Sequence, residues 1–310
     1  MIRKLIAILL VVLPAAALPA ADTDSLRTRP TIWADVTAVG GSAAVNAALT
    51  EIFKHSIHAE RPDGSSYDSW PSRHTSYAFA ILGSVGYRAA RYSGWWLVGA
   101  HTAANVVAMQ RMLADRHYPK DVLGGAATGI VSIAAGEVLS RLIFHGQGPV
   151  FYRGDVPERG SVDAFTTAVF PLGETGHGQK LLTGAKAGLR FTRSFNTRWG
   201  MSLEASSTSF PLDRHYERPE MLHTYGLAAG ATACFSTGAC TLEPRLMAGA
   251  QYNSRTGEIS VCSFTCAATC TAVFNISRTC AIGAEAGYEL RTMNSLLSSV
   301  TLGLFSRVRF

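Results

Sequence analysis

The spacing of apolar residues divides the chain into two parts. From about Trp33 to Phe144, apolar positions such as Val45, Leu49 and Ile52 recur with the period of a helix. Four helical stretches are predicted, over residues 34–60, 76–92, 94–113 and 121–144, with a segment rich in Pro, Gly and Ser over 61–76. None of them reaches about 18 uninterrupted strongly apolar residues. We therefore expect the buried helices of a soluble all-α bundle, with membrane-spanning helices as the alternative.

Beyond a Gly- and Pro-containing linker over 149–160, the period of the pattern changes to two, as in β-strands. One face of each stretch carries small apolar residues, with aromatics near the strand ends, and the other carries Glu, Lys and Arg among glycines. Eight strands are predicted, near 162–170, 180–192, 197–209, 221–235, 239–252, 258–274, 279–291 and 297–310. The fold class is therefore α+β with two domains, a helical bundle followed by an antiparallel β-sheet.

A charged inner face and a small, apolar outer face are typical of a transmembrane barrel with a polar lumen. The predicted connections alternate between long and short, as outer loops and periplasmic turns do. The last residue, Phe310, resembles the terminal aromatic of bacterial outer-membrane barrels. This half resembles an eight-stranded outer-membrane β-barrel, and a soluble β-domain is the alternative. An even number of strands would leave the helical domain and Phe310 on the periplasmic side.

The first 20 residues have a basic start, an apolar run of about ten residues and small residues after it, which predicts a secretory signal peptide. The expected domains are a signal peptide at 1–20, a helical domain at 21–148, a linker at 149–160 and a barrel at 161–310. The formal net charge of +6 is modest, and no dense Lys/Arg run indicates nucleic acid.

Six cysteines all follow residue 230, which fits an oxidising compartment. Two pairs flank short predicted turns, Cys234 with Cys240 and Cys270 with Cys280, and either could form a hairpin disulfide. The alternative is that the cysteines serve as small apolar residues.

Candidate chemistry is concentrated in the stretch Arg111 to Asp121. Arg111 carries a permanent charge and a planar fork of donors for an oxyanion. His117 can serve as a nucleophile or a proton carrier, and Asp121, four residues later, could fix its tautomer. Pro119 suits the first turn of a helix that begins near Tyr118, so His117 is expected at or just before the helix start. For these three residues alone, a surface salt bridge is the alternative.

Two earlier clusters favour a chemical site over a surface salt bridge. Lys54 and Arg61 are seven residues apart, and we expect them on one face of a helix that Pro62 ends. Ser72 precedes the next predicted helix, whose free N–H groups suit an anion, and His74 adds a titratable group. Three cations, a hydroxyl, backbone donors and two histidines are what the stabilisation of a phosphoryl group in transfer requires.

The ordered patterns Lys-x6-Arg-Pro, Pro-Ser-x-His and Arg-x5-His-x3-Asp resemble those of the type 2 phosphatidic acid phosphatase family, which includes periplasmic acid phosphatases and vanadium haloperoxidases. The resemblance covers roughly residues 35–145. It implies that cations and backbone hold the phosphate, that one histidine attacks phosphorus and another protonates the leaving group, and that no metal or other cofactor is needed. The implied residues are Lys54, Arg61, Arg111, Ser72 and Arg73 for phosphate binding, His117 as nucleophile, His74 as acid, and Asp121 as the group that orients His117.

Two positions depart from the family pattern. Arg73 stands where the family usually has Gly, and Gln110 where it usually has Ser. Arg73 could add a cation for a doubly charged or pyrophosphate substrate, or its side chain could point to solvent, which is the interpretation we favour. The neighbouring Arg111 is intact, so the change at Gln110 is expected to matter little.

These features together predict a metal-independent phosphatase that acts on a phosphate monoester or pyrophosphate, on a lipid or a small phosphoester, through a phosphohistidine. The predicted location is the bacterial outer membrane, after insertion by the barrel-assembly machinery, with the catalytic domain facing the periplasm. The alternatives are a vanadate-dependent haloperoxidase and a non-catalytic barrel scaffold with a degenerate phosphatase domain.

Overall fold

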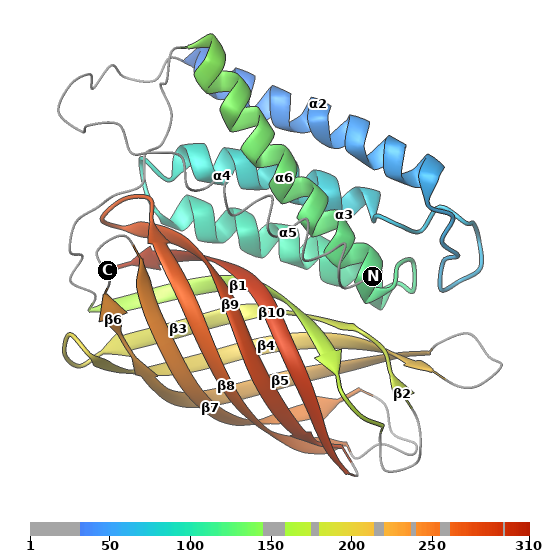
Figure 1. Ribbon diagram of the computed structural model, residues 1–310, viewed down its shortest axis with the longest axis vertical. Helices are drawn as coiled ribbons and strands as arrows, with labels where there is room; N and C mark the ends of the chain where they lie inside the picture. Colours follow the sequence, from blue (N-terminus) through green and yellow to red (C-terminus); the bar gives the residue numbers. More distant parts are fainter. Residues whose placement is uncertain are drawn as a thin grey trace.

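The computed structural model describes residues 32–144, 159–174, 180–213, 220–236, 240–254, 261–293 and 295–310. The predicted signal peptide and nearly all of the predicted linker lie outside these residues, so both stay predictions. Figure 1 shows a bundle of helices lying along one side of a β-barrel.

The helical domain follows the predicted pattern closely. Its elements are α2 (Ile32–Ser56), α3 (Arg73–Tyr77), the π-helical η1 (Ala78–Leu82), α4 (Gly83–Ala89), α5 (Trp95–Leu113) and α6 (Pro119–Ile143). The three elements α3, η1 and α4 follow one another without a break. One expectation is wrong: α2 ends at Ser56, so Arg61 lies in the following loop and does not share a helical face with Lys54.

Glycines allow the helices of the bundle to approach closely. A Cβ atom on Gly136 in α6 would lie 2.3 Å from the carbonyl oxygen of Ala38 in α2. On Gly129 it would lie 2.7 Å from the carbonyl oxygen of Ser76, and on Gly125 2.7 Å from that of Ser72. Only glycine permits such close contacts with backbone, so these small residues let α6 pack tightly against its neighbours.

All eight predicted strands are present, and they close into a barrel. They are β1 (Gly160–Pro171), β3 (Gly184–Ser194), β4 (Trp199–Asp213), β5 (Glu220–Ala233), β7 (Thr241–Asn253), β8 (Cys262–Asn275), β9 (Cys280–Thr292) and β10 (Leu296–Arg309). Neighbours in sequence pair antiparallel, and β1 pairs with both β3 and β10, which closes the ring. The short strands β2 (Lys180–Leu181) and β6 (Phe235–Ser236) add to β4 and β7.

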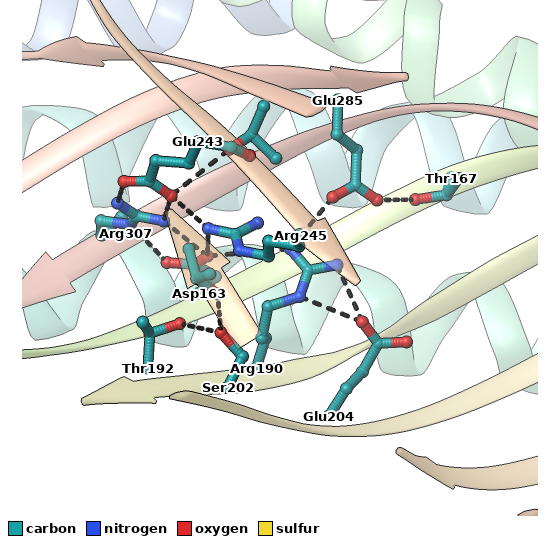
Figure 2. A network of polar contacts seen from close by, with 12 residues as sticks. Asp163, Thr167, Arg190, Thr192, Ser202, Glu204, Glu243, Arg245, Glu285 and Arg307 are labelled. Carbon is teal, nitrogen blue, oxygen red and sulfur yellow. Dashed lines mark hydrogen bonds and ion pairs between the residues drawn. The ribbon is translucent and has the colours of Figure 1, made fainter. Parts of the chain in front are cut away.

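The interior of the barrel is filled by paired charges, as Figure 2 shows. Arg307 donates to Asp163 from Nε at 2.6 Å and to Glu243 from Nη2 at 2.8 Å. Arg190 donates to Glu204 at 2.8 Å and to Glu285 at 3.0 Å. Pairing therefore runs across the lumen between strands. In the β9–β10 register Arg307 stands opposite Ala281, four residues along β9 from Glu285. Side chains of an antiparallel pair meet directly opposite or diagonally, so Arg307 and Glu285 are too far apart in register to form a cross-strand pair.

The outer face is apolar wherever the helices do not cover it. Leu227, Leu246 and Phe264 expose 71%, 66% and 72% of their surface. Exposed aromatics gather toward the two ends of the barrel, Phe195, Trp199 and Phe235 at one end and Tyr225, Tyr252, Phe264 and Tyr288 toward the other. A polar lumen, an apolar belt and aromatic girdles are the features of a transmembrane β-barrel.

Three cysteines, Cys262, Cys266 and Cys270, lie along the exposed face of β8. Cys270 stands opposite Ala286, six residues along β9 from Cys280, or about 20 Å at the rise of a strand. A disulfide between Cys270 and Cys280 is therefore ruled out.

Helix α5 lies against the outer wall of the barrel formed by β1, β10 and β3. At its N-terminal end the ring of Trp95 stacks on that of Phe310, with centroids 6.3 Å apart. At its C-terminal end Met112 belongs to a core cluster that also contains Ala185 of β3 and contacts Met221 of β5. The helix therefore runs the height of the barrel.

Candidate active site

The predicted chemical residues converge at one end of the bundle. The C-terminal ends of α2 and α5 and the N-terminal ends of α3 and α6 meet there, as Figure 1 shows. These ends carry Lys54, Arg111, Ser72 with His74, and Asp121. Arg61 and His117 come from the adjoining loops. We call the cluster of Lys54, Arg61, Ser72, His74, Arg111 and His117 the cradle.

His117 is almost completely buried and lies two residues before α6, as predicted from Pro119. Its Nδ1 is 3.3 Å from Ser69 Oγ and 4.0 Å from Asp121 Oδ2. Ser69 Oγ in turn donates to Asp121 Oδ2 at 2.6 Å. Asp121 therefore reaches His117 mainly through the Ser69 hydroxyl. With Nδ1 turned toward these oxygens, Nε2 is the ring nitrogen left for attack.

The start of α6 brings these groups together. Asp121 Oδ2 also accepts the backbone N–H of Tyr118 at 2.9 Å, which caps the helix. Gly124 and Gly125 let the loop before Ser72 lie on α6, because a Cβ on Gly124 would be 2.4 Å from Trp70 Nε1. The backbone N–H of Ser72 donates to the carbonyl of Asp121 at 2.9 Å. The two glycines thus allow Ser69 to reach Asp121.

A carboxylate occupies part of the cradle. Asp68 Oδ1 accepts from Nε of Arg61 at 3.1 Å, and its Oδ2 lies 3.8 Å from Nζ of Lys54. Lys54 also donates to the Asp68 carbonyl oxygen. The Ser66 hydroxyl, and then Lys54 and Arg61, lower the pKa of Asp68. Asp68 is therefore a carboxylate that contacts two of the cations expected to hold phosphate, and a bound phosphate would compete with it.

The cations surround both histidines. Burial, and then the charges of Arg61, Arg111 and Lys54, lower the pKa of His117 to about 3. Burial, and then chiefly Arg111 and Arg61, also lower the pKa of His74. Neutral His117 is therefore the stable form in the absence of a ligand, as a nucleophile requires. Within the described residues, Nε of Arg111 is buried and has no hydrogen-bond partner, so the cradle has an unused donor.

Arg73, the main departure from the family pattern, points away from the cradle. Its Nη2 lies 2.5 Å from Oε1 of Glu51 on α2, and both side chains are half exposed. This agrees with the expectation that its side chain faces solvent. Ser72 is buried and accepts a hydrogen bond from Thr75 at 3.0 Å. Gln110 is exposed on α5.

Two residues of the site could not be predicted from the sequence. Ser69, which bridges His117 and Asp121, and Asp68, which contacts Lys54 and Arg61, both lie in the segment rich in Pro, Gly and Ser. A lone Ser or Asp in such a segment has no signal beyond its turn propensity. Among the described residues, no three His, Cys, Asp or Glu side chains lie close enough together to hold a metal ion.

Comparison with known proteins agrees with this geometry. The family model of the PAP2 superfamily matches residues 26–141, so this region of the chain is a PAP2 superfamily domain. The chain is 30% identical over 126 residues to the lipid A 1-phosphatase of Porphyromonas gingivalis. That match covers 41% of this chain, and the chain spans only 28% of the length of that relative.

Similar solved structures lie in the barrel half. Neisserial surface protein A has 16% identity and a TM-score of 0.35, and covers 49% of this chain with 97% of its own. The outer membrane enzyme PagL has 15% identity and a TM-score of 0.32, and covers 48% of this chain with 99% of its own. The closed antiparallel barrel itself rests on the strand pairing described above.

Proposed function

We propose that the protein is a lipid phosphatase of the outer membrane that works through a phosphohistidine at His117. The observation that carries this proposal is the gathering of Lys54, Arg61 and Arg111 around two histidines, one of them buried and neutral. The PAP2 match over these residues and the similarity to the lipid A 1-phosphatase of P. gingivalis support the chemistry. The lipid-facing surface of the barrel supports the location.

In the proposed reaction, phosphate oxygens bind Lys54, Arg61 and Arg111 and displace the carboxylate of Asp68. Nε2 of His117 attacks phosphorus, and the bond from phosphorus to the ester oxygen breaks. The leaving oxygen takes a proton from His74. Ser69 and Asp121 stabilise the charge that develops on His117. His74 then accepts a proton from a water molecule that attacks the phosphohistidine, which releases inorganic phosphate and restores the free enzyme.

The cations do the work that a metal ion does in other phosphatases, because they neutralise the charge on the equatorial oxygens of the transferring group. We therefore propose that no metal ion takes part. Burial of the attacking nitrogen and fixed donors around the phosphate are the two features that favour transfer over simple binding.

The test is release of phosphate by purified full-length protein in detergent micelles, with a phosphorylated lipid and with a water-soluble phosphate monoester, each with and without a chelator. We expect hydrolysis of the lipid that the chelator does not reduce. His117→Ala should lower turnover by several decades, since covalent catalysis leaves no substitute. His55→Ala, at the exposed end of α2 outside the cradle, is the matched control and should act as wild type. Full activity of His117→Ala would refute the mechanism.

A further inference from the structure

The polarity of helix α2 is inverted relative to that of a helix in a water-soluble protein. Its buried face, toward α6 and α3, carries Ser42, Asn46 and Thr50. Its exposed face over the same length carries Val36, Gly40, Ala44 and Ala48. A helix at a water interface places polar side chains outward. Polar side chains buried between helices, with apolar side chains facing out, are the arrangement of helices surrounded by lipid.

Helix α6 repeats this arrangement. In α6, Thr128, Ser132 and Ser140 are buried, while Val138 and Leu139 are exposed. By length and composition, both α2 and α6 are apolar enough to cross a membrane. That criterion alone would also accept the core helix of a soluble protein. The inverted faces are independent evidence, because a core helix does not expose its apolar side.

The uncharged part of each helix has the height of a membrane. No Asp, Glu, Lys or Arg occurs from Val36 to Thr50, from Trp95 to Gln110 or from Val122 to Gly136. At the helical rise these stretches span roughly 22–24 Å. The apolar band of an outer-membrane barrel is about 25 Å tall. Charges lie at the two ends of the bundle, with the cradle at one end and Arg88, bonded to Glu137 at 2.7 Å, toward the other.

The seam between bundle and barrel contains hydrogen-bonded polar side chains that are buried or partly buried. His101 of α5 hydrogen bonds with Thr166 Oγ1 at 2.8 Å and with Ser306 Oγ at 3.0 Å, both on the outer face of the barrel. Asn105 donates to the carbonyl oxygen of Phe165 at 2.9 Å and accepts from Thr166 at 2.6 Å. The outer surface of the barrel carries hydroxyl groups under α5, whereas the uncovered outer surface carries apolar residues such as Leu227. The polarity of the surface under α5 therefore suits contact with a helix and not contact with lipid.

We propose that bilayer lipid covers the outward faces of α2, α5 and α6, so that the bundle lies within the membrane beside the barrel. The apolar surface of the helices continues the apolar belt of the barrel at the same height. Aromatics reinforce this continuity, because exposed Trp95 and Trp96 of α5 lie at the same end as Trp199 of the barrel, next to the ring of Phe310. Such aromatics mark the interface of a membrane with water.

This placement also sets the side on which the cradle opens. The strand ends at Ser194 and Trp199, Ala233 and Thr241, and Asn275 and Cys280 lie at the end of the barrel where Phe310 contacts Trp95. The strand ends at Pro171 and Gly184, Asp213 and Glu220, Asn253 and Cys262, and Thr292 and Leu296 lie at the opposite end, which we call the long-connection end. Met112, one residue after Arg111, packs with Met221 near that end, and Asp115, in the loop after α5, lies close enough to His223 of β5 for their charges to interact. The cradle is therefore at the long-connection end.

In outer-membrane barrels the short turns face the periplasm and the longer loops face outward. The cradle would then open toward the outer leaflet, opposite to the periplasmic side expected from the sequence. If the proposed function holds, the substrate is a phosphorylated lipid headgroup in that leaflet, which diffuses laterally to the rim of the barrel. The charge of the cradle would lie at headgroup height.

Labelling with a photoactivatable lipid tests the lipid cover. Wild-type protein in outer membranes is irradiated with the probe, and labelled residues are mapped by mass spectrometry. We expect label on α2 between 36 and 48 and on α6 between 130 and 139, at levels within about threefold of those at Leu227 and Leu246, the lipid-facing reference on the barrel. Label confined to the barrel strands would overturn the proposal.

Access of an antibody to three epitope tags in intact cells tests the orientation. A tag after Gly64, in the loop beside the cradle, is compared with one after Gly173 at the long-connection end and one after Asn196 at the other end. We expect the Gly64 and Gly173 tags to react in intact cells and the Asn196 tag only after permeabilisation. A Gly64 tag that reacts only after permeabilisation, like the Asn196 tag, would overturn the orientation. Loss of the proposed function would instead be seen as absent phosphate release in detergent, whatever the labelling pattern.

Discussion

The barrel lumen and the cradle both gather buried or half-buried cations, and the difference between them separates structural charges from functional ones. In the lumen, basic side chains meet a similar number of carboxylates. Asp163, Glu204, Glu243, Glu285 and Glu289 face Lys186, Arg190, Arg245, Arg291 and Arg307. In the cradle, one carboxylate, Asp68, pairs with two of the three cations, Lys54 and Arg61.

Charge balance explains what each region can do. A balanced lumen stabilises the barrel and leaves little field to attract an ion, since buried charges persist when they are paired and hydrogen-bonded. The unbalanced cradle keeps an excess positive charge at an open end of the bundle, which attracts an anion. The contrast implies that changes in the lumen affect folding, whereas changes in the cradle affect binding and turnover.

The largest effect on turnover other than that of the nucleophile is expected from His74→Ala, which should lower kcat/KM by roughly 10²–10⁴-fold. His74 must be protonated to act as the acid, and burial with the nearby arginines lowers its pKa below 6.5. In wild type, kcat/KM should therefore fall as the pH rises through that lowered pKa. On the acid side it should fall as His117 gains a proton near pH 3. His74→Ala should lose the alkaline limb, and an unchanged pH profile would show that His74 is not the acid.

In the lumen, Arg307→Met should destabilise the barrel by about 3–5 kcal/mol, because it removes the cation that hydrogen bonds to both Asp163 and Glu243 and leaves these buried charges only partly balanced. Ser299→Ala on the same strand, also buried in the lumen, is the matched control and should cost less than about 1 kcal/mol. The measurement is the denaturant midpoint of the barrel in detergent. Equal midpoints for the two variants would contradict a structural role for the lumen charges.

A smaller effect is expected when the carboxylate is removed from the cradle. Asp68→Asn should tighten inhibition by inorganic phosphate a few-fold, roughly the effect of one exposed charge pair, because Arg61 and Lys54 lose a competing partner. Asp63→Asn removes an exposed carboxylate that pairs with Arg116 outside the cradle, and should leave inhibition unchanged. Weaker inhibition in Asp68→Asn would mean that Asp68 positions the cations and does not compete with the ligand.

The smallest effect is expected at Arg73, whose side chain pairs with Glu51 on the surface. Arg73→Gly should change kcat/KM on monoester and pyrophosphate substrates by no more than about twofold, as for most exposed ion pairs. Glu51→Gln breaks the same pair without changing the backbone at position 73. A large loss in Arg73→Gly alone would place Arg73 among the phosphate ligands.

The sequence alone was sufficient to predict the helices and strands and the residues proposed to react. Period-two alternation of charged and apolar positions located all eight strands, since each face of a barrel strand meets one environment. The helical pattern and the fixed spacing of Lys54, Arg111, His117 and Asp121 located the bundle and most of the cradle. Pro119 predicted the start of α6 and so the place of His117.

What the sequence did not give depends on contacts between distant segments. Lumen partners such as Arg307 and Glu243 are 64 residues apart and meet only once the barrel closes. Ser69 reaches Asp121 because Gly124 and Gly125 let the loop lie on α6. The seam between His101 and the barrel wall joins a helix to strands far along the chain. Periodicity along one segment contains none of this information.

The most direct test of the account is to trap the phosphohistidine. Full-length protein in detergent is mixed with a phosphorylated lipid, quenched under alkaline conditions that preserve phosphohistidine, and digested for mass spectrometry. We predict one phosphoryl group on the peptide that contains His117, present in wild type and absent in His117→Ala. Turnover of substrate by wild type with no phosphoryl group on His117 at any quench time would contradict the account.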